Sequence, residues 1–156
     1  LEDEFRVERR MRAVLQRVLN ASVTRLCVLL GIAADDTEED LEYIIKKILN
    51  VRVFEDETGK KMWARSVKDM GLEILCGNKP DFHRSMKTEF SKEMYANFIN
   101  RIKQEYFEDR IKDGVFGAMM NVSLVNEGPV TLELDSRKFI YSEKNASSSK
   151  SKSENI

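Results

Sequence analysis

Between residues 37 and 49 the apolar side chains repeat at the spacing of an α-helix. These positions are Leu41, Ile44, Ile45, Ile48 and Leu49. They form one continuous stripe on a helical surface. Thr37 stands at the start of the stretch as a capping residue, and Asp40 follows three residues later, as in a capping box. The pattern predicts a helix that packs its stripe against the core of its own chain rather than into a partner's groove.

A second helix is predicted over residues 88–107. Its apolar positions also recur every three or four residues: Met94, Tyr95, Phe98, Ile99, Ile102 and Tyr106. An aromatic-rich face of this kind could stack the bases of a nucleic acid. Such regular spacing is more typical of core packing, so this helix too is expected to cover a core.

Short strand-like segments surround the two helices. They are predicted at residues 13–24, 27–30, 51–54, 72–76 and 120–134. The last of these has two alternating halves on either side of a loop at residues 126–129, and a further loop is predicted at residues 77–80. No turn residue separates Thr24 from Arg25, although an antiparallel hairpin needs one. About five short strands with two inserted helices predict an α+β fold.

Length and charge indicate one domain with polar ends. We assign residues 1–10 to a charged leader, 11–136 to the domain and 137–156 to a polar, disordered tail. The net charge of -1 and the pI near 6.0 exclude a global basic field. Any contact with nucleic acid must therefore use a local patch or a pocket. On composition alone, an ordinary cytosolic domain is expected.

Cys27 and Cys76, the two cysteines, lie in apolar runs and are expected to be buried, unreactive thiols. The sequence has no Cys-x-x-Cys pair and no Cys/His cluster, so neither a zinc site nor another cofactor is expected. Residues 1–10 lack an apolar signal core, and the run at residues 26–30 is too short to span a bilayer. We therefore expect a cytoplasmic protein without membrane contact.

No set of catalytic side chains is evident. His83 is the only histidine, and no serine or cysteine stands near it in a nucleophile-elbow setting. The unusual feature is Gly128-Pro129, between two strand-like segments where proline cannot donate to a ladder. Such a pair tolerates a cis bond, and a rigid backbone hook could probe a ligand by its shape. We predict a cis bond here; the alternative is a plain turn.

Five stretches, in order along residues 11–136, together resemble the D-aminoacyl-tRNA deacylase family in its animal form. They are residues 11–18 with 21–24, residues 27–32, 48–54, 77–83 and 122–131. The resemblance implies the family's α+β fold, with an antiparallel, barrel-like sheet and two main helices. It also implies a homodimer that hydrolyses the ester between a D-amino acid, or mischarged glycine, and the 3′ adenosine of a tRNA. This reaction is chiral proofreading in translation.

The resemblance also assigns substrate-binding residues. Gly128 and Pro129 are implied to form a cis hook that enters the partner's site and excludes L-amino acids by steric clash. Arg17 is implied to brace this hook, and Met120 to line the pocket. The family uses no side-chain triad, since backbone amides and the substrate's own 2′-hydroxyl carry the reaction. No catalytic side chain is therefore assigned.

Two internal segments of the family pattern are missing from this chain. The family has a strand reading Ser-Gln-Phe-Thr-Leu after the stretch matched by residues 73–76, where this chain continues at once with Gly77. That strand holds the terminal adenosine and the reacting carbonyl. A glycine-containing hairpin is also missing between Thr24 and Arg25. Loss of even one oxyanion donor costs about 100–1,000-fold in rate, so slow catalysis is expected.

Two interpretations of these gaps remain open. The chain is either a truncated splice form or gene-model product of an active enzyme, or a diverged member of the family. In the second case it would be non-catalytic but would still dimerise, and would bind nucleic acid or regulate an intact paralogue.

Overall fold

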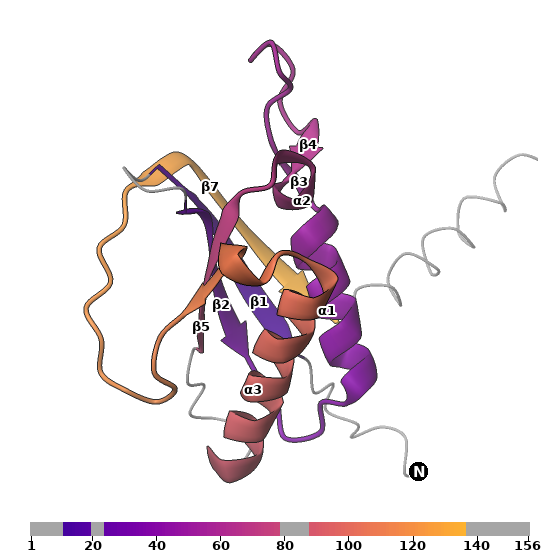
Figure 1. Cartoon of the computed structure of the whole chain (residues 1–156), viewed down its shortest axis with the longest axis vertical. Coiled ribbons are helices and arrows are strands. Elements are labelled where there is room, and N and C mark those ends of the chain that lie inside the picture. The colour runs from indigo at the N-terminus through magenta and orange to yellow at the C-terminus, as the bar shows by residue number, and fades with distance from the viewer. Residues whose placement is uncertain (1–10, 20–23, 79–87, 137–156) are drawn as a thin grey trace, which may run out of the picture.

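The computed structural model describes residues 11–19, 24–78 and 88–136 (Figure 1). The charged leader, the polar tail and His83 lie outside the described residues. In chain order the elements are β1 (Arg12–Val18), β2 (Thr24–Gly31), α1 (Glu38–Asn50), β3 (Arg52–Phe54), β4 (Arg65–Ser66), α2 (Val67–Met70), β5 (Glu73–Asn78), α3 (Thr88–Glu105), the 3-10 turn η1 (Glu108–Arg110), β6 (Ile111–Asp113) and β7 (Asn126–Asp135). No helix in these ranges is long and apolar enough to cross a membrane.

Five strands form one open sheet in the order β6-β5-β2-β1-β7, and β3 pairs with β4 in a separate hairpin. Strand β1 is antiparallel to β2 and β7, whereas β2, β5 and β6 run parallel. The α+β prediction is confirmed. The antiparallel, barrel-like arrangement is wrong, because β2 and β5 pair directly and in parallel, and β6 and β7 remain two separate edges in the described part of the sheet.

Both predicted helices are confirmed to within two residues at each end, as α1 and α3. The carboxylate of Asp40 accepts hydrogen bonds from the backbone N–H and the hydroxyl of Thr37, at 2.9 and 3.0 Å, and so fixes the start of α1. Figure 1 shows α1 and α3 side by side over one face of the sheet. Arg101 of α3 donates to Glu38 of α1 over 2.9 Å at their outer surface.

The core lies between these two helices and the sheet. All five apolar stripe positions of α1 are at most 1% exposed, and Phe98 and Ile102 of α3 are fully buried. Burial of each such side chain contributes about 1.5–3 kcal/mol. The central positions of the aromatic face of α3 are thus used for packing, as predicted, and are not available for stacking bases. Cys27 and Cys76 are buried, free thiols, which confirms their assignment.

Two strand boundaries differ from the prediction. Strand β1 ends at Val18, and Thr24 already belongs to β2, where it lies opposite Glu73. Thr24 and Arg25 are thus consecutive residues of one strand, and no hairpin lies between them. Gly77 and Asn78 were predicted to be a loop but continue β5. Parallel pairing with β2 overrides their turn preference.

The prediction of a strand at residues 120–124 is wrong, because the segment pairs with no strand among the described residues. Its alternating pattern is present, but a strand needs a neighbour to satisfy its N–H and C=O groups. Met119 is fully exposed, and Val122 is 58% exposed. Asn126 and the three residues after it, predicted to be a loop, instead form the first part of β7.

Candidate functional site

A bulge in edge strand β7 presents Gly128 and Pro129. Gln16 of β1 lies opposite Thr131, and Val18 lies opposite Asn126. Residues 127–130 therefore face a single residue of β1 and bulge out of the ladder. The Gly128-Pro129 bond is cis, which confirms the prediction, and both residues are exposed. We call this pair the hook.

The β1 residue opposite the bulge is Arg17, whose side chain is only 6% exposed. Its Nε donates to the carbonyl of Glu127 at 3.3 Å, and its Nη1 donates to the carbonyl of Val53 at 2.9 Å. The same Nε lies 3.5 Å from the Glu127 carboxylate. One buried guanidinium thus links the residue before the hook to strand β3. A buried cation needs such partners, and here they are mainly backbone carbonyls.

Sequence reasoning missed two members of this cluster, Arg25 and Glu127. Nη2 of Arg25 lies 3.1 Å from Oε2 of Glu127, so two arginines share one carboxylate. Nε of Arg25 is buried without a hydrogen-bond partner among the described residues. The signal in the sequence was a charged residue directly before the apolar run that forms most of β2.

Gly128 has no room for a side chain. Its φ angle is 120°, in a region that L side chains rarely adopt. A Cβ atom at this position would lie 2.8 Å from both the backbone nitrogen and the Cγ2 of Val130. Glycine is therefore required at position 128 by the backbone angle and by the closeness of Val130.

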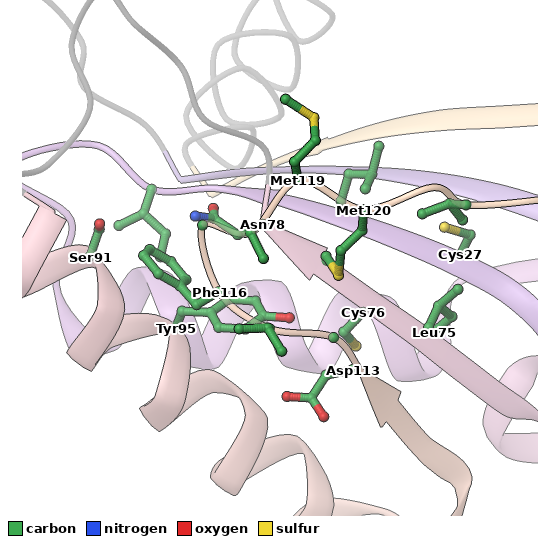
Figure 2. Close-up of a pocket in the computed structure, with 18 of the residues that line it drawn as sticks. Cys27, Leu75, Cys76, Asn78, Ser91, Tyr95, Asp113, Phe116, Met119 and Met120 are labelled. Carbon is green, nitrogen blue, oxygen red and sulfur yellow. The ribbon is translucent and has the colours of Figure 1, made fainter.

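A pocket of about 730 Å³ lies on the other side of β1. Its floor comes from β2 and β5, its wall from the first half of α3, and its cover from residues between 113 and 124, which connect β6 to β7 (Figure 2). Met120 is one of its lining residues, with Met119, Phe116 and Tyr95. Its Sδ lies against Gly114, within 2.6 Å of where a Cβ would stand. Polar groups are few: Gln16, Asn78, Ser91, Thr88 and Asp113.

The two thiols and the Tyr95 hydroxyl of the pocket are held neutral. Burial raises the pKa of the Cys27 thiol, of the Cys76 thiol and of the Tyr95 hydroxyl above their ordinary values. The nearby charge of Asp113 raises the last two further. None of these groups is therefore an activated nucleophile at neutral pH. The described residues also contain no group of three or more His, Cys, Asp or Glu side chains that could hold a metal ion.

The four residues assigned by resemblance divide into two groups. Arg17 and Gly128 lie together, with Nη2 of Arg17 3.5 Å from the Cβ position of Gly128, and Pro129 follows directly. Met120 lies in the pocket, whose lining includes none of the other three. Neighbouring residues of β1 separate the two places: Gln16 lines the pocket, and Arg17 contacts the bulge.

The sequence matches the family model for D-Tyr-tRNA(Tyr) deacylase over residues 14–135. It is 47% identical to D-aminoacyl-tRNA deacylase 1 of Homo sapiens, with 81% of this chain and 70% of the relative covered. It is 48% identical to D-aminoacyl-tRNA deacylase of Drosophila melanogaster, with 81% and 92% covered.

Both of these matches run over 148 aligned residues. Because 81% of 156 residues is about 126, about 22 aligned positions have no counterpart in this chain. That difference agrees with two missing internal segments.

Two solved structures share the fold. The c-Myc DNA Unwinding Element Binding Protein superposes with a TM-score of 0.72 at 46% identity, covering 80% of this chain and 97% of that one. A probable eukaryotic D-amino acid tRNA deacylase superposes with a TM-score of 0.66 at 16% identity, covering 81% and 99%. At 16% identity the second match supports the fold alone.

Proposed function

This chain belongs to the D-aminoacyl-tRNA deacylase family, and on that premise we propose that its own reaction is the family's ester hydrolysis. The bond cleaved joins a D-amino acid, or a wrongly attached glycine, to the 3′ adenosine of a tRNA. The role would be proofreading during translation in the cytoplasm. The observation that carries the proposal is the exposed hook, with buried Arg17 bonded beside it at the position that the family pattern assigns.

Within this proposal the hook rejects the wrong substrate. Its carbonyls and the proline ring form a fixed surface, so an L side chain would clash with it while a hydrogen atom or a D side chain would not. Selectivity of this kind depends on position. The bonds from Arg17 to Glu127 and Val53 supply that position by anchoring the bulge on two strands.

We further propose that two copies of the chain form the complete site. The hook and the Met120 pocket lie on opposite sides of β1, so one chain does not place its own hook in its own pocket. A homodimer in which each hook enters the partner's pocket would solve this. Among the described residues the outer edge of β7, which carries the hook, pairs with no strand, and we propose it for such pairing.

The chemistry would not use a nucleophilic side chain. The buried thiols and the Tyr95 hydroxyl of the pocket are held neutral, which fits a reaction that relies on backbone amides and on the substrate's 2′-hydroxyl. The missing Ser-Gln-Phe-Thr-Leu strand should supply some of those amides. We therefore expect slow hydrolysis with preserved selectivity, because the hook is present and the adenosine platform is not.

The second candidate function is that of a non-catalytic family member that dimerises and binds nucleic acid or regulates an intact paralogue. Residues 120–124 favour it, since they cover the pocket but pair with no strand among the described residues.

Single-turnover deacylation of D-tyrosyl-tRNA, with L-tyrosyl-tRNA as control, separates the two candidates. A relative that carries Ser-Gln-Phe-Thr-Leu is assayed in parallel. The enzymatic proposal expects a measurable rate with the D substrate, about 100-fold or more below the relative, and none with the L substrate. No difference from spontaneous hydrolysis would favour the non-catalytic candidate. Equal rates for the two proteins would refute the role given to the missing strand.

A further inference from the structure

The loop between β3 and β4 presents an exposed tryptophan. Trp63 is 52% exposed, and its φ angle of 59° is the only positive value at a non-glycine position among the described residues. A bulky side chain adopts this conformation rarely and only when its surroundings impose it. The loop projects from the body of the molecule beyond β3 and β4 (Figure 1).

The backbone on both sides of Trp63 is anchored. The carboxylate of Asp56 accepts hydrogen bonds from the backbone N–H groups of Thr58, Lys60 and Lys61, at 3.2–3.3 Å. On the other side, the N–H of Ala64 donates to the carbonyl of Phe54 over 2.9 Å. These bonds hold the turn on both sides of Trp63 and so fix the backbone from which the indole projects.

Two lysines lie beside the indole, in a loop that also carries three acids. Lys60 and Lys61 are exposed, and neither forms an ion pair within the described part of the chain. Of the three acids, Asp56 binds the N–H groups of the turn, and Glu57 lies 3.6 Å from Arg65. Glu55 is the one exposed acid of the loop without such a partner. Met62, 39% exposed, extends the apolar surface.

This loop is connected to the hook through Arg17. The same guanidinium donates to Glu127, which precedes the hook, and to Val53, which precedes Phe54 in β3. Phe54 in turn pairs with Arg65 and accepts from Ala64, the neighbour of Trp63. The indole and the hook are therefore on elements fixed to a common residue.

From these observations we propose that Trp63, Lys60 and Lys61 form a contact surface for unpaired RNA, with a base stacked on the indole and phosphates facing the two ammonium groups. Aromatic side chains beside lysines bind single strands in this way, because every base has a π-face and every nucleotide a phosphate. The inference rests on the proposed function in one respect: the RNA would be the unpaired 3′ end of the tRNA whose ester lies at the hook.

The chain offers a direct probe, because Trp63 is its one tryptophan. Emission of the intact protein is titrated with an unpaired RNA oligonucleotide ending in C-C-A, and with polyphosphate, which has the charge but no bases. We expect the RNA to quench the emission and polyphosphate to leave it nearly unchanged. Equal quenching by both would overturn base stacking. Emission that depends on protein concentration without RNA would mean that a second copy covers the indole, and would overturn the proposal.

Variants test the same surface with a labelled RNA and anisotropy. Trp63→Ala should weaken binding about 5- to 100-fold, and Trp63→Phe should retain most of it. Removing both lysines should lower the slope of log affinity against log salt by about 1.4. Phe90→Ala and Lys112→Ala are matched controls, since both side chains are exposed on other elements, α3 and β6. Equal losses in controls and test variants would overturn the assignment.

The oligonucleotide carries no amino acid, so its binding does not depend on hydrolysis. Quenching by RNA in a protein that fails to deacylate would uphold the RNA surface and refute the enzymatic proposal. Selective deacylation with no effect of Trp63→Ala on RNA affinity would uphold the enzymatic proposal and refute the RNA surface. Thermal unfolding of each variant confirms that it is folded before its affinity is compared.

Discussion

The guanidinium of Arg17 donates to the carbonyl of Glu127 over 3.3 Å, one residue before Gly128, and to the carbonyl of Val53 on a different strand. A residue of β1 thus sets the position of a surface feature on β7.

Arg17→Ala should destabilise the protein by about 2–4 kcal/mol, because it leaves two carbonyls without their donor and opens a buried space. Arg17→Lys should recover only part of this, since one ammonium cannot reach both carbonyls along the two directions of a guanidinium. Urea unfolding measures both values. If Arg17 braces the hook, Arg17→Lys should also lower the preference for D- over L-tyrosyl-tRNA. A variant with full stability and full preference would contradict it.

Arg25 should matter less than Arg17. Its side chain and that of Glu127 are each about 30% exposed, so their ion pair is partly screened by solvent. A double-mutant cycle with Arg25→Ala and Glu127→Gln should give a coupling energy of about 0.5–1 kcal/mol. This coupling energy is calculated from the unfolding free energies of the original chain, the two single variants and the double variant. A coupling above about 2 kcal/mol would mean that Arg25 holds the bulge as strongly as Arg17.

Gly128→Ala should be more harmful than Gly71→Ala, although both glycines have positive φ angles. Gly71, at the end of α2, has nothing within 4 Å of its Cβ position, so its substitution carries only the conformational cost of about 1–2 kcal/mol. Gly128 adds a contact of 2.8 Å with the backbone of Val130. We expect the difference in unfolding free energy to exceed about 1 kcal/mol. Equal costs would show that the bulge relaxes freely.

Stability should fall above pH 9. Burial raises the pKa of the Cys27 and Cys76 thiols above the ordinary value of 9.0, so the folded state keeps them neutral while the unfolded state ionises. Their contribution is complete below pH 9 and is lost as the pH rises, by up to about 1.4 kcal/mol per thiol and pH unit. Urea midpoints between pH 8 and 10 measure the decline, which Cys76→Ala should make shallower. A midpoint independent of pH over this range would contradict the burial.

The sequence predicted the features that depend on local spacing. The stripe from Leu41 to Leu49 and the aromatic positions of α3 are short-range patterns, and both helices are present. The wrong predictions concern which segments, distant in the sequence, pair as strands. Gly77 continues β5 because Leu29 lies beside it, and no local signal reports that neighbour. Arg17 and the hook came from the family resemblance, whereas Arg25 and Trp63 depend on contacts and backbone angles that no periodicity encodes.

The unpaired segment before β7 gives the last prediction, which concerns backbone amide exchange. Residues 120–124 have the alternation of a strand but pair with no strand in the described part of the chain, so their amides should exchange with solvent nearly as fast as in an unfolded peptide. Thr131 to Leu134 of β7 pair with β1 and should be strongly protected. Hydrogen–deuterium exchange read by mass spectrometry compares the two segments within one sample. The same measurement on a relative that carries Ser-Gln-Phe-Thr-Leu is the control, and there the aligned segment should be protected. Equal, rapid exchange in both proteins would mean that the missing strand is not what orders this segment. In that case the exposure of Met119 and Val122 would need another cause, and the expected loss of catalytic rate would lose its structural basis.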